Sequence, residues 1–206
     1  REPLFEFLEE KYGKIRIIEE KNMGKSRADI VMVLPKAVVG IEIKSDADTY
    51  ARLERQITDY DRYFDFNYVV IGSKHAMHIK EHVPDWWGVI SVELIEDAVD
   101  FYVIREAEEN KICDMKKKLS LLWRPELAHI QELNEMPKYK QRSKEFVIDK
   151  ILDAVAPEIL TEQISQELFE RDYNAIAQTI QTFREENGKK KRRKKTKYKK
   201  YKRKNI

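Results

Sequence analysis

The chain has 206 residues, of which 37% are charged, with a formal net charge of +3 and a single cysteine. This length suffices for one medium α/β domain with an extension. Cys113 has no partner for an internal disulfide, which favours a reducing compartment, and we expect a cytoplasmic protein. No run of 18 apolar residues and no basic-then-apolar leader is present, so neither a membrane span nor an export signal is predicted.

The charge is unevenly distributed along the chain. Residues Lys189 to Lys204 contain 13 Lys and Arg and no acidic residue, so the remainder has 27 basic residues against 37 acidic ones. Such a block repels itself, which predicts a disordered arm that binds nucleic acid. A solubilising, localisation or anionic-surface tail is the alternative. We expect these tail residues to contact nucleic acid: Lys190, Arg192, Arg193 and Lys199.

The first half of the chain alternates helical and strand patterns. Leu4, Phe5 and Leu8 have helical spacing, and Gly13 ends that helix. Turn residues separate three apolar stretches, which predicts an antiparallel meander. The predicted elements are a helix at Pro3 to Lys11 and strands at Lys14 to Glu20, Ala28 to Leu34 and Val38 to Lys44.

A helical crossover follows the third strand. The pattern predicts a helix from Thr49 to Tyr63, capped by Ser45 or Asp48. A strand reached through a helix usually lies parallel to the one before it. The next elements are a strand at Asn67 to Ile71, a helix at Ser73 to Val83 and a fifth strand at Val89 to Leu94. Trp86 and Trp87 are predicted core anchors, and base stacking is the less favoured interpretation.

The pattern loosens after Asp97. Phe101 to Arg105 is a possible strand, and a helix is predicted from Leu119 to Leu133, with Pro125 in a first turn or at a kink. Two amphipathic helices follow on either side of Pro157, at Ser143 to Val155 and Thr161 to Glu186. A helix-turn-helix is possible here, but packing against the core is the commoner use of such a pair.

An acid and an E-x-K triplet occupy two successive predicted strands. Glu42 and Lys44 share one strand face because side chains alternate along a strand, and Asp29 opens the preceding apolar strand. Two converging carboxylates suit Mg²⁺ or Mn²⁺, which favour oxygen ligands. Such a metal lowers the pKa of a water and stabilises charge on a phosphate, and Lys44 is placed to orient that water. The alternative for Glu42 and Lys44 is a solvated ion pair.

Three histidines suggest a second metal site. His75, His78 and His82 have helical spacing, which would place them on one face. Zinc sites usually need a further preorganised ligand, and no cysteine pair lies near. A polar surface face is therefore the favoured interpretation.

The sequence around Asp29 and Glu42 resembles a known family. Four short segments are similar to the sce7726 family of the PD-(D/E)xK nuclease superfamily. They are R-A-D-I-V beginning at Arg27, G-I-E-I-K-S-D at Gly40, P-D-W-W-G-V-I at Pro84 and L-L-W-R-P-E-L at Leu121. The resemblance covers roughly residues 1–133. Ala28 stands where the superfamily's name has proline.

This resemblance implies a role for each residue of the site. Asp29 and Glu42 would be metal ligands, the Ile43 carbonyl a third ligand and Lys44 the catalytic lysine. Gln56 and Tyr60 would form a supporting Q-x-x-x-Y motif. A further acidic ligand would come from Glu6, Glu10, Glu19 or Glu20, with Glu20 favoured because it lies near the turn.

The resemblance also implies a fold for the first part of the chain. The expected fold is an α/β, restriction-endonuclease-like core with a mixed five-stranded sheet flanked by helices. The sequence pattern of the remaining residues adds a C-terminal helical extension and a disordered basic tail. The expected segments are a nuclease core at 1–96, a hairpin and helical elaboration at 97–142, the helical extension at 143–187 and the tail at 188–206.

The predicted function is metal-dependent hydrolysis of phosphodiester bonds in nucleic acid, with DNA favoured over RNA. Arg27, Arg52 and Arg55 would contact phosphates, although Arg52 and Arg55 have acidic neighbours with which they would equally pair. The alternative is a catalytically inactive module of the same fold that binds nucleic acid or protein. A tail that meets an anionic membrane would leave Asp29, Glu42 and Lys44 without a role.

Overall fold

The computed structural model describes residues 1–96, 98–172, 175, 178, 181 and 182. The chain divides into two units, residues 1–171 and residues 172–206. All the helices and strands named below belong to the first unit. The predicted basic tail lies outside the described residues, as does most of the predicted helix beyond residue 172.

A mixed sheet of six strands forms the centre of the first unit, in the order β1-β2-β3-β4-β5-β6. The predicted meander is confirmed, since β1, β2 and β3 are antiparallel, and the β3–β4 and β4–β5 pairs are parallel. The strands are β1 Arg16–Met23, β2 Ser26–Leu34, β3 Ala37–Lys44, β4 Phe66–Gly72, β5 Gly88–Ile95 and β6 Ala98–Arg105.

The predicted count of five strands is wrong because β6 is a full strand, antiparallel to β5. Tyr102 and Ile104 are exposed on this edge strand, whereas Phe101 and Val103 are partly buried. An edge strand has a neighbour on one side only, so its sequence need not show the continuous apolar run of the central strands.

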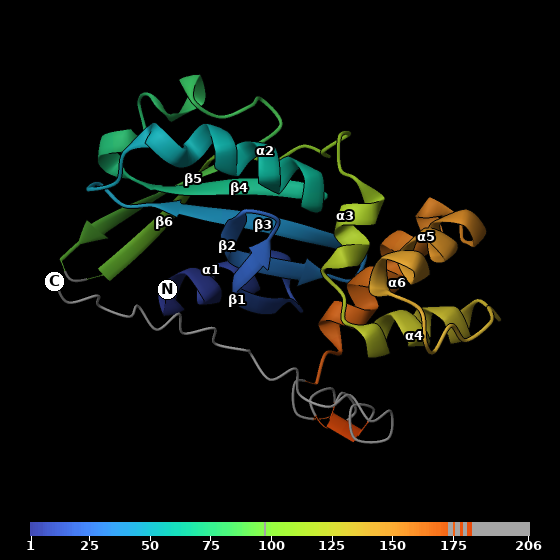
Figure 1. Cartoon of the computed structure of the whole chain (residues 1–206). Helices are drawn as coiled ribbons and strands as arrows, with labels where there is room; N and C mark the ends of the chain where they lie inside the picture. Colours follow the sequence, from blue (N-terminus) through green and yellow to red (C-terminus); the bar gives the residue numbers. More distant parts are fainter. Residues whose placement is uncertain (97, 173–174, 176–177, 179–180, 183–206) are drawn as a thin grey trace, which may run out of the picture. The chain divides into compact units, whose positions relative to one another are not determined.

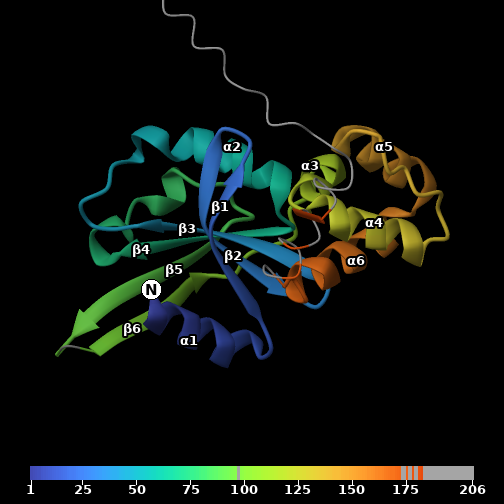
Figure 2. The same cartoon turned by 60° about the horizontal axis from the view of Figure 1, so that its bottom comes forward.

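Helices cover both faces of the sheet. Alternate strand residues Ile30, Met32 and Ile41 pack with Leu4 and Leu8 of α1, Glu2–Tyr12. The opposite face packs against α2, Leu53–Tyr63, and against four C-terminal helices. These are α3 Met115–Ser120, α4 Arg124–Leu133, α5 Lys144–Ala154 and α6 Pro157–Phe169. Figures 1 and 2 show α1 and α2 on opposite sides of the strands.

Gly40 allows α2 to lie close to β3. A Cβ atom built at this position would lie 2.3 Å from the Phe64 ring and 2.6 Å from the Tyr60 ring. Real Cβ atoms do not approach that closely, so a side chain here would push α2 away from the sheet. Glycine at position 40 therefore brings the polar residues of α2 within reach of β3.

Two predicted helices in the middle of the chain are wrong in detail. The segment predicted as a helix at Ser73 to Val83 contains two short 3-10 turns, Ser73–His75 and Ile79–Glu81. The helix predicted from Thr49 begins as a 3-10 turn, Tyr50–Arg52, and neither Ser45 nor Asp48 caps it. Asp48 instead accepts hydrogen bonds from the backbone N–H and the hydroxyl of Ser45.

The predicted helix from Leu119 to Leu133 divides into α3 and α4. Pro125 lies in the first turn of α4, where its missing N–H costs no helical hydrogen bond. Asp114 caps α3 independently by accepting from the N–H groups of Lys116 and Lys117. Two separate start signals therefore give two helices.

The two helices around Pro157 pack into the core. Ser143 caps α5 as predicted, but α6 begins at Pro157, earlier than expected, because proline fits its first turn. Val147 and Ile151 of α5 and Ile164 of α6 are fully buried. The favoured interpretation of this pair is confirmed. None of the described helices is long and apolar enough to cross a membrane.

Candidate active site

The divergence of β2 and β3 opens a polar site at one end of the sheet. Their ladder runs from Leu34 and Ala37 as far as Ile30 and Ile41. Beyond this pair, Asp29 lies at the separating end of β2, and Glu42 and Lys44 follow on β3. The Asp29 side chain spans the gap, where Oδ2 accepts a hydrogen bond of 2.9 Å from the Ile43 N–H. The structure therefore brings the three predicted residues together.

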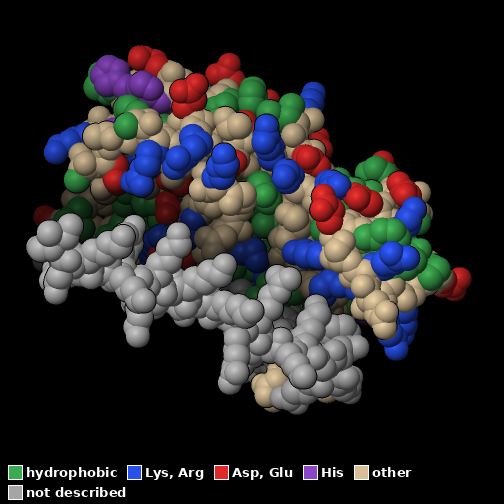
Figure 3. All heavy atoms as spheres, viewed as in Figure 1, with side chains coloured by type: hydrophobic (Ala, Val, Ile, Leu, Met, Phe, Trp, Pro, Cys, Tyr) green, Lys and Arg blue, Asp and Glu red, His purple; other side chains and the backbone are tan. Residues whose placement is uncertain are grey.

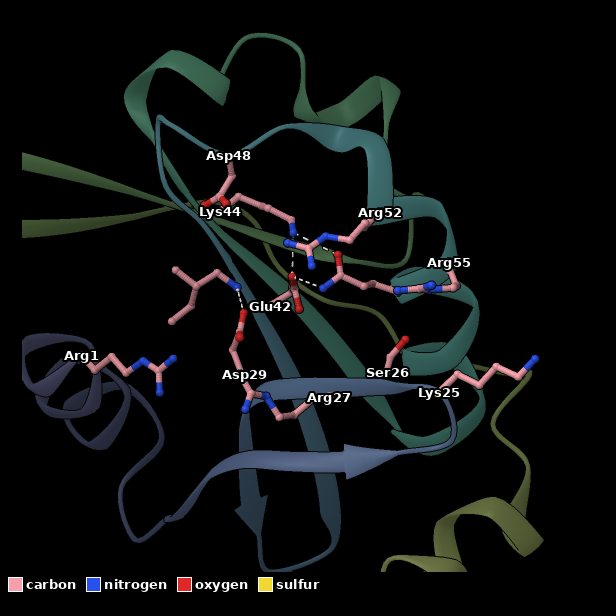
Figure 4. A pocket seen from close by; sticks show the side chains of 12 residues that line it. Arg1, Lys25, Ser26, Arg27, Asp29, Glu42, Lys44, Asp48, Arg52 and Arg55 are labelled. Atoms are coloured by element: carbon pink, nitrogen blue, oxygen red, sulfur yellow. Dashed lines mark hydrogen bonds and ion pairs between the residues drawn. The ribbon is translucent and has the colours of Figure 1, made fainter. Parts of the chain in front are cut away.

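Glu42 and Lys44 form a buried ion pair at this site. The Lys44 Nζ atom lies 2.8 Å from Glu42 Oε1, and the two residues are 5% and 1% exposed. Gln56 of α2 joins them: its Oε1 accepts from Lys44 Nζ at 3.0 Å and its Nε2 donates to Glu42 Oε1. Figure 4 shows the Glu42 and Lys44 side chains pointing toward each other. The alternative interpretation, a solvated ion pair, is therefore wrong, because both residues are buried.

Tyr60 connects both carboxylate-bearing strands. Its hydroxyl donates to Glu42 Oε2 at 2.8 Å, or alternatively to the Ile41 carbonyl at 3.2 Å. The same oxygen accepts a hydrogen bond of 3.1 Å from the Asp29 N–H. Tyr60 is fully buried, and this burial together with Glu42 raises its pKa well above the ordinary value. Its hydroxyl therefore stays protonated and holds the two strands in a fixed relation.

The site holds more negative charge than its one lysine neutralises. Burial raises the pKa of Glu42 most, and the nearby Asp29 carboxylate raises it further, while Lys44 and Tyr60 oppose the shift. Asp29 Oδ1 accepts no hydrogen bond from a described residue. A cation next to Asp29 and Glu42 would offset their repulsion.

A cleft of about 490 Å³ opens above these residues. It is lined by Arg1, Lys25, Ser26, Arg27, Asp29, Glu42, Ile43, Lys44, Asp48, Arg52, Arg55 and Gln56. Six cationic side chains thus surround three carboxylates. Figure 3 shows Lys and Arg side chains gathered on the face beside α2. Asp29 and Glu42 lie at the floor of a cleft whose walls are positive, a charge pattern suited to a phosphate chain.

The structure gathers most of the predicted site residues. Arg27, Arg52 and Arg55 line the cleft with Asp29, Glu42, Ile43, Lys44 and Gln56. Glu20 does not line it. Glu20 has a positive φ of 52° and its carboxylate pairs with Arg27 at 3.1 Å and Arg1 at 3.8 Å. The tail residues Lys190, Arg192, Arg193 and Lys199 lie outside the described residues.

Four lining residues were not predicted: Arg1, Lys25, Ser26 and Asp48. Lys25 follows Gly24 in the turn between β1 and β2, and Ser26 is the first residue of β2. A turn directly before a strand that bears a candidate ligand was the available signal for them. Arg1 and Asp48 reach the cleft through tertiary packing, for which the sequence offers no local signal.

The donors at the floor fit a magnesium or manganese ion with two protein carboxylates. Among the described residues, no three His, Cys, Asp or Glu side chains form a metal-binding group. Magnesium commonly uses one or two carboxylates and takes its other ligands from water and substrate phosphates. The set of Asp29 and Glu42, with the Ile43 carbonyl nearby, matches that requirement.

The three histidines do not form a zinc site within the described chain. His75 Nδ1 is hydrogen-bonded to the Tyr50 hydroxyl at 2.7 Å, and the His82 ring stacks on Tyr50. His78 lies 3.5 Å from Glu81. His75 and His82 thus share Tyr50 as a neighbour and His78 lies beside Glu81, in agreement with the favoured polar-surface interpretation.

A family comparison corrects the predicted sce7726 assignment. The model of the bacteriophage P4 protein cII family matches residues 3–197, which is nearly the whole chain. This match is much longer than the short sequence segments that suggested the sce7726 family. No curated protein and no solved structure matches the chain. The chain belongs to the bacteriophage P4 protein cII family.

Proposed function

We propose that this protein is a metal-dependent nuclease that hydrolyses phosphodiester bonds, with DNA as the favoured substrate. One observation carries the proposal. Asp29, Glu42 and Lys44 lie together at the floor of a cleft whose walls carry Lys25, Arg27, Arg52 and Arg55. An acidic floor suits a divalent cation, and positive walls suit the phosphates on either side of the scissile one.

The protein's own residues divide the chemical work. Asp29 and Glu42 would hold Mg²⁺ or Mn²⁺, which supplies positive charge beside the phosphate and lowers the pKa of a water. The Lys44 ammonium has three donors, and two of them serve Glu42 and Gln56. The third donor has no acceptor among the described residues and would orient the attacking water or stabilise charge on the phosphate. Gln56 and Tyr60 keep Glu42 and Lys44 in place.

The finer fold assignment belongs to the same proposal. A helix, an antiparallel meander, a crossover helix and parallel strands succeed one another from α1 to β5. The two carboxylates stand where the second and third strands diverge. These features support a restriction-endonuclease-like core, to which β6 and the C-terminal helices are added.

A catalytically inactive module that binds nucleic acid is the second candidate. The observation that favours it is the direct ion pair between Glu42 and Lys44, which neutralises one ligand. In addition, no three His, Cys, Asp or Glu side chains among the described residues form a group that could hold a metal. The cationic walls would serve such a module equally well.

Cleavage assays separate these two functions. Linear, circular and single-stranded DNA are incubated with the protein, with and without Mn²⁺, beside the Asp29→Asn and Glu42→Gln variants. The proposal expects cleavage that needs the metal and is lost in both variants. Equal cleavage by variant and wild-type proteins, or none by any of them while DNA is still bound, would falsify it.

The basic tail is proposed to strengthen binding. Its 13 cations in residues 189–204 would add phosphate contacts to an otherwise acidic chain. A protein truncated after residue 188 should bind DNA more weakly and with a shallower salt dependence. An unchanged affinity and an unchanged salt slope would remove this role from the tail.

A further inference from the structure

Three of the cleft's cations have no ion-pair partner among the described residues: Lys25, Arg52 and Arg55. All three are exposed. Arg1 and Arg27, by contrast, pair with Glu19 and Glu20 at 2.8 and 3.1 Å. The three unpaired cations are therefore the lining groups most available to an anionic ligand.

The remaining polar side chains of the lining already have partners. Gln56 uses both its amide oxygen and its amide nitrogen on Lys44 and Glu42. The Ser26 hydroxyl donates to Asp59, and Asp48 accepts from Ser45. None of the described residues that line the cleft is aromatic. The cleft thus offers neither an amide to read a base edge nor a ring on which to stack a base.

The three cations come from two parts of the cleft wall. Lys25 lies in the turn between β1 and β2, Arg52 ends the 3-10 turn before α2, and Arg55 lies in the first turn of α2. Figure 4 labels these three residues around the cleft. The Ser26–Asp59 hydrogen bond attaches this turn to α2. Gly24, with a φ of +57°, provides the left-handed conformation of the turn. The spacing of the two walls is thereby fixed.

We infer that the cleft recognises a polynucleotide through its phosphates alone, and that Lys25 in the β1–β2 turn is a substrate-binding residue. The inference rests on the proposed nucleic-acid substrate and does not depend on hydrolysis. Phosphate contacts position a strand without reading its sequence. The expected specificity is therefore for a nucleic-acid backbone of any sequence.

Equilibrium binding in EDTA tests this inference, because without metal the strand stays intact. Single-stranded 20-mers of thymidine, of adenosine and of mixed sequence are titrated with the full chain at several salt concentrations. The three affinities should agree within about threefold. Lys25→Ala should weaken each by about fivefold at 100 mM salt and reduce the salt slope by about 0.7, the value for one phosphate contact on a single strand.

Lys36→Ala is the matched control. Lys36 is an exposed lysine in the turn at the other end of β2, remote from the lining residues, and should bind as the wild type does. An affinity difference above a hundredfold between sequences, or a Lys25→Ala protein that binds like Lys36→Ala, would overturn the inference. A protein that shows the expected binding but cleaves nothing with Mn²⁺ supports the inference and contradicts the proposed hydrolysis.

Discussion

Two buried ion pairs of the first unit have different surroundings. Arg171 donates from Nε and Nη2 to the two oxygens of Glu126 at 2.6 and 2.7 Å, and its guanidinium lies 4.9 Å from the Trp123 ring. The Glu42–Lys44 pair is nearly as buried, but the repelling Asp29 carboxylate stands beside it and a cleft opens above it. The first pair is enclosed, and the second is accessible.

The comparison teaches that burial of an ion pair does not by itself mark a functional site. Glu126 and Arg171 satisfy each other and hold α4 against the chain that follows α6. Glu42 and Lys44 satisfy each other only in part, since the excess charge of Asp29 remains. An unneutralised carboxylate at the floor of a cationic cleft is the feature that favours metal and phosphate binding.

The largest expected effect is a loss of stability when the enclosed Glu126–Arg171 ion pair is broken. Arg171→Met leaves the Glu126 carboxylate buried without its cation, which should lower the free energy of unfolding by about 3–5 kcal/mol. Urea denaturation measures this loss. The double variant Glu126→Gln with Arg171→Met should recover much of it. A loss below about 1 kcal/mol would show that the pair is less isolated from water than its burial indicates.

A smaller effect is expected from the residue that supports the accessible pair. Tyr60→Phe removes the hydroxyl shared by the Asp29 N–H and Glu42, and should lower metal-dependent cleavage by about 10–100-fold. Tyr63→Phe is the control, because the Tyr63 hydroxyl on the same helix makes no hydrogen bond with a described residue. Equal activities of the two variants would contradict a positioning role for Tyr60.

The smallest effect is expected on stability when the accessible pair is broken. Glu42→Gln should change the free energy of unfolding by only about 1 kcal/mol, because Lys44 keeps its hydrogen bond to Gln56 and the repulsion between Glu42 and Asp29 is removed. The same urea denaturation measures it beside Arg171→Met. A cost as large as that of Arg171→Met would erase the proposed difference between the two pairs.

The central strands and the three core site residues were predictable. The apolar run from Ile30 to Val33 and the alternation around Glu42 and Lys44 are local patterns, and local patterns identify strands and their faces. Elements at the margins were less predictable. The exposed edge strand β6 and the two 3-10 turns near His75 depend on how much tertiary packing each segment receives.

The sequence by itself determined which side chains can bind a cation or a phosphate: Asp29 and Glu42 on successive strands, Lys44 beside them and a helix with Arg52, Gln56 and Arg55. The tertiary structure alone decided which of them meet. It places Glu20 against Arg27 and outside the cleft lining. It also brings Lys25 into that lining, next to Ser26, whose hydroxyl is hydrogen-bonded to Asp59 of α2. The physical reason is that face alternation is a local property, whereas strand divergence and helix packing depend on residues far apart in the chain.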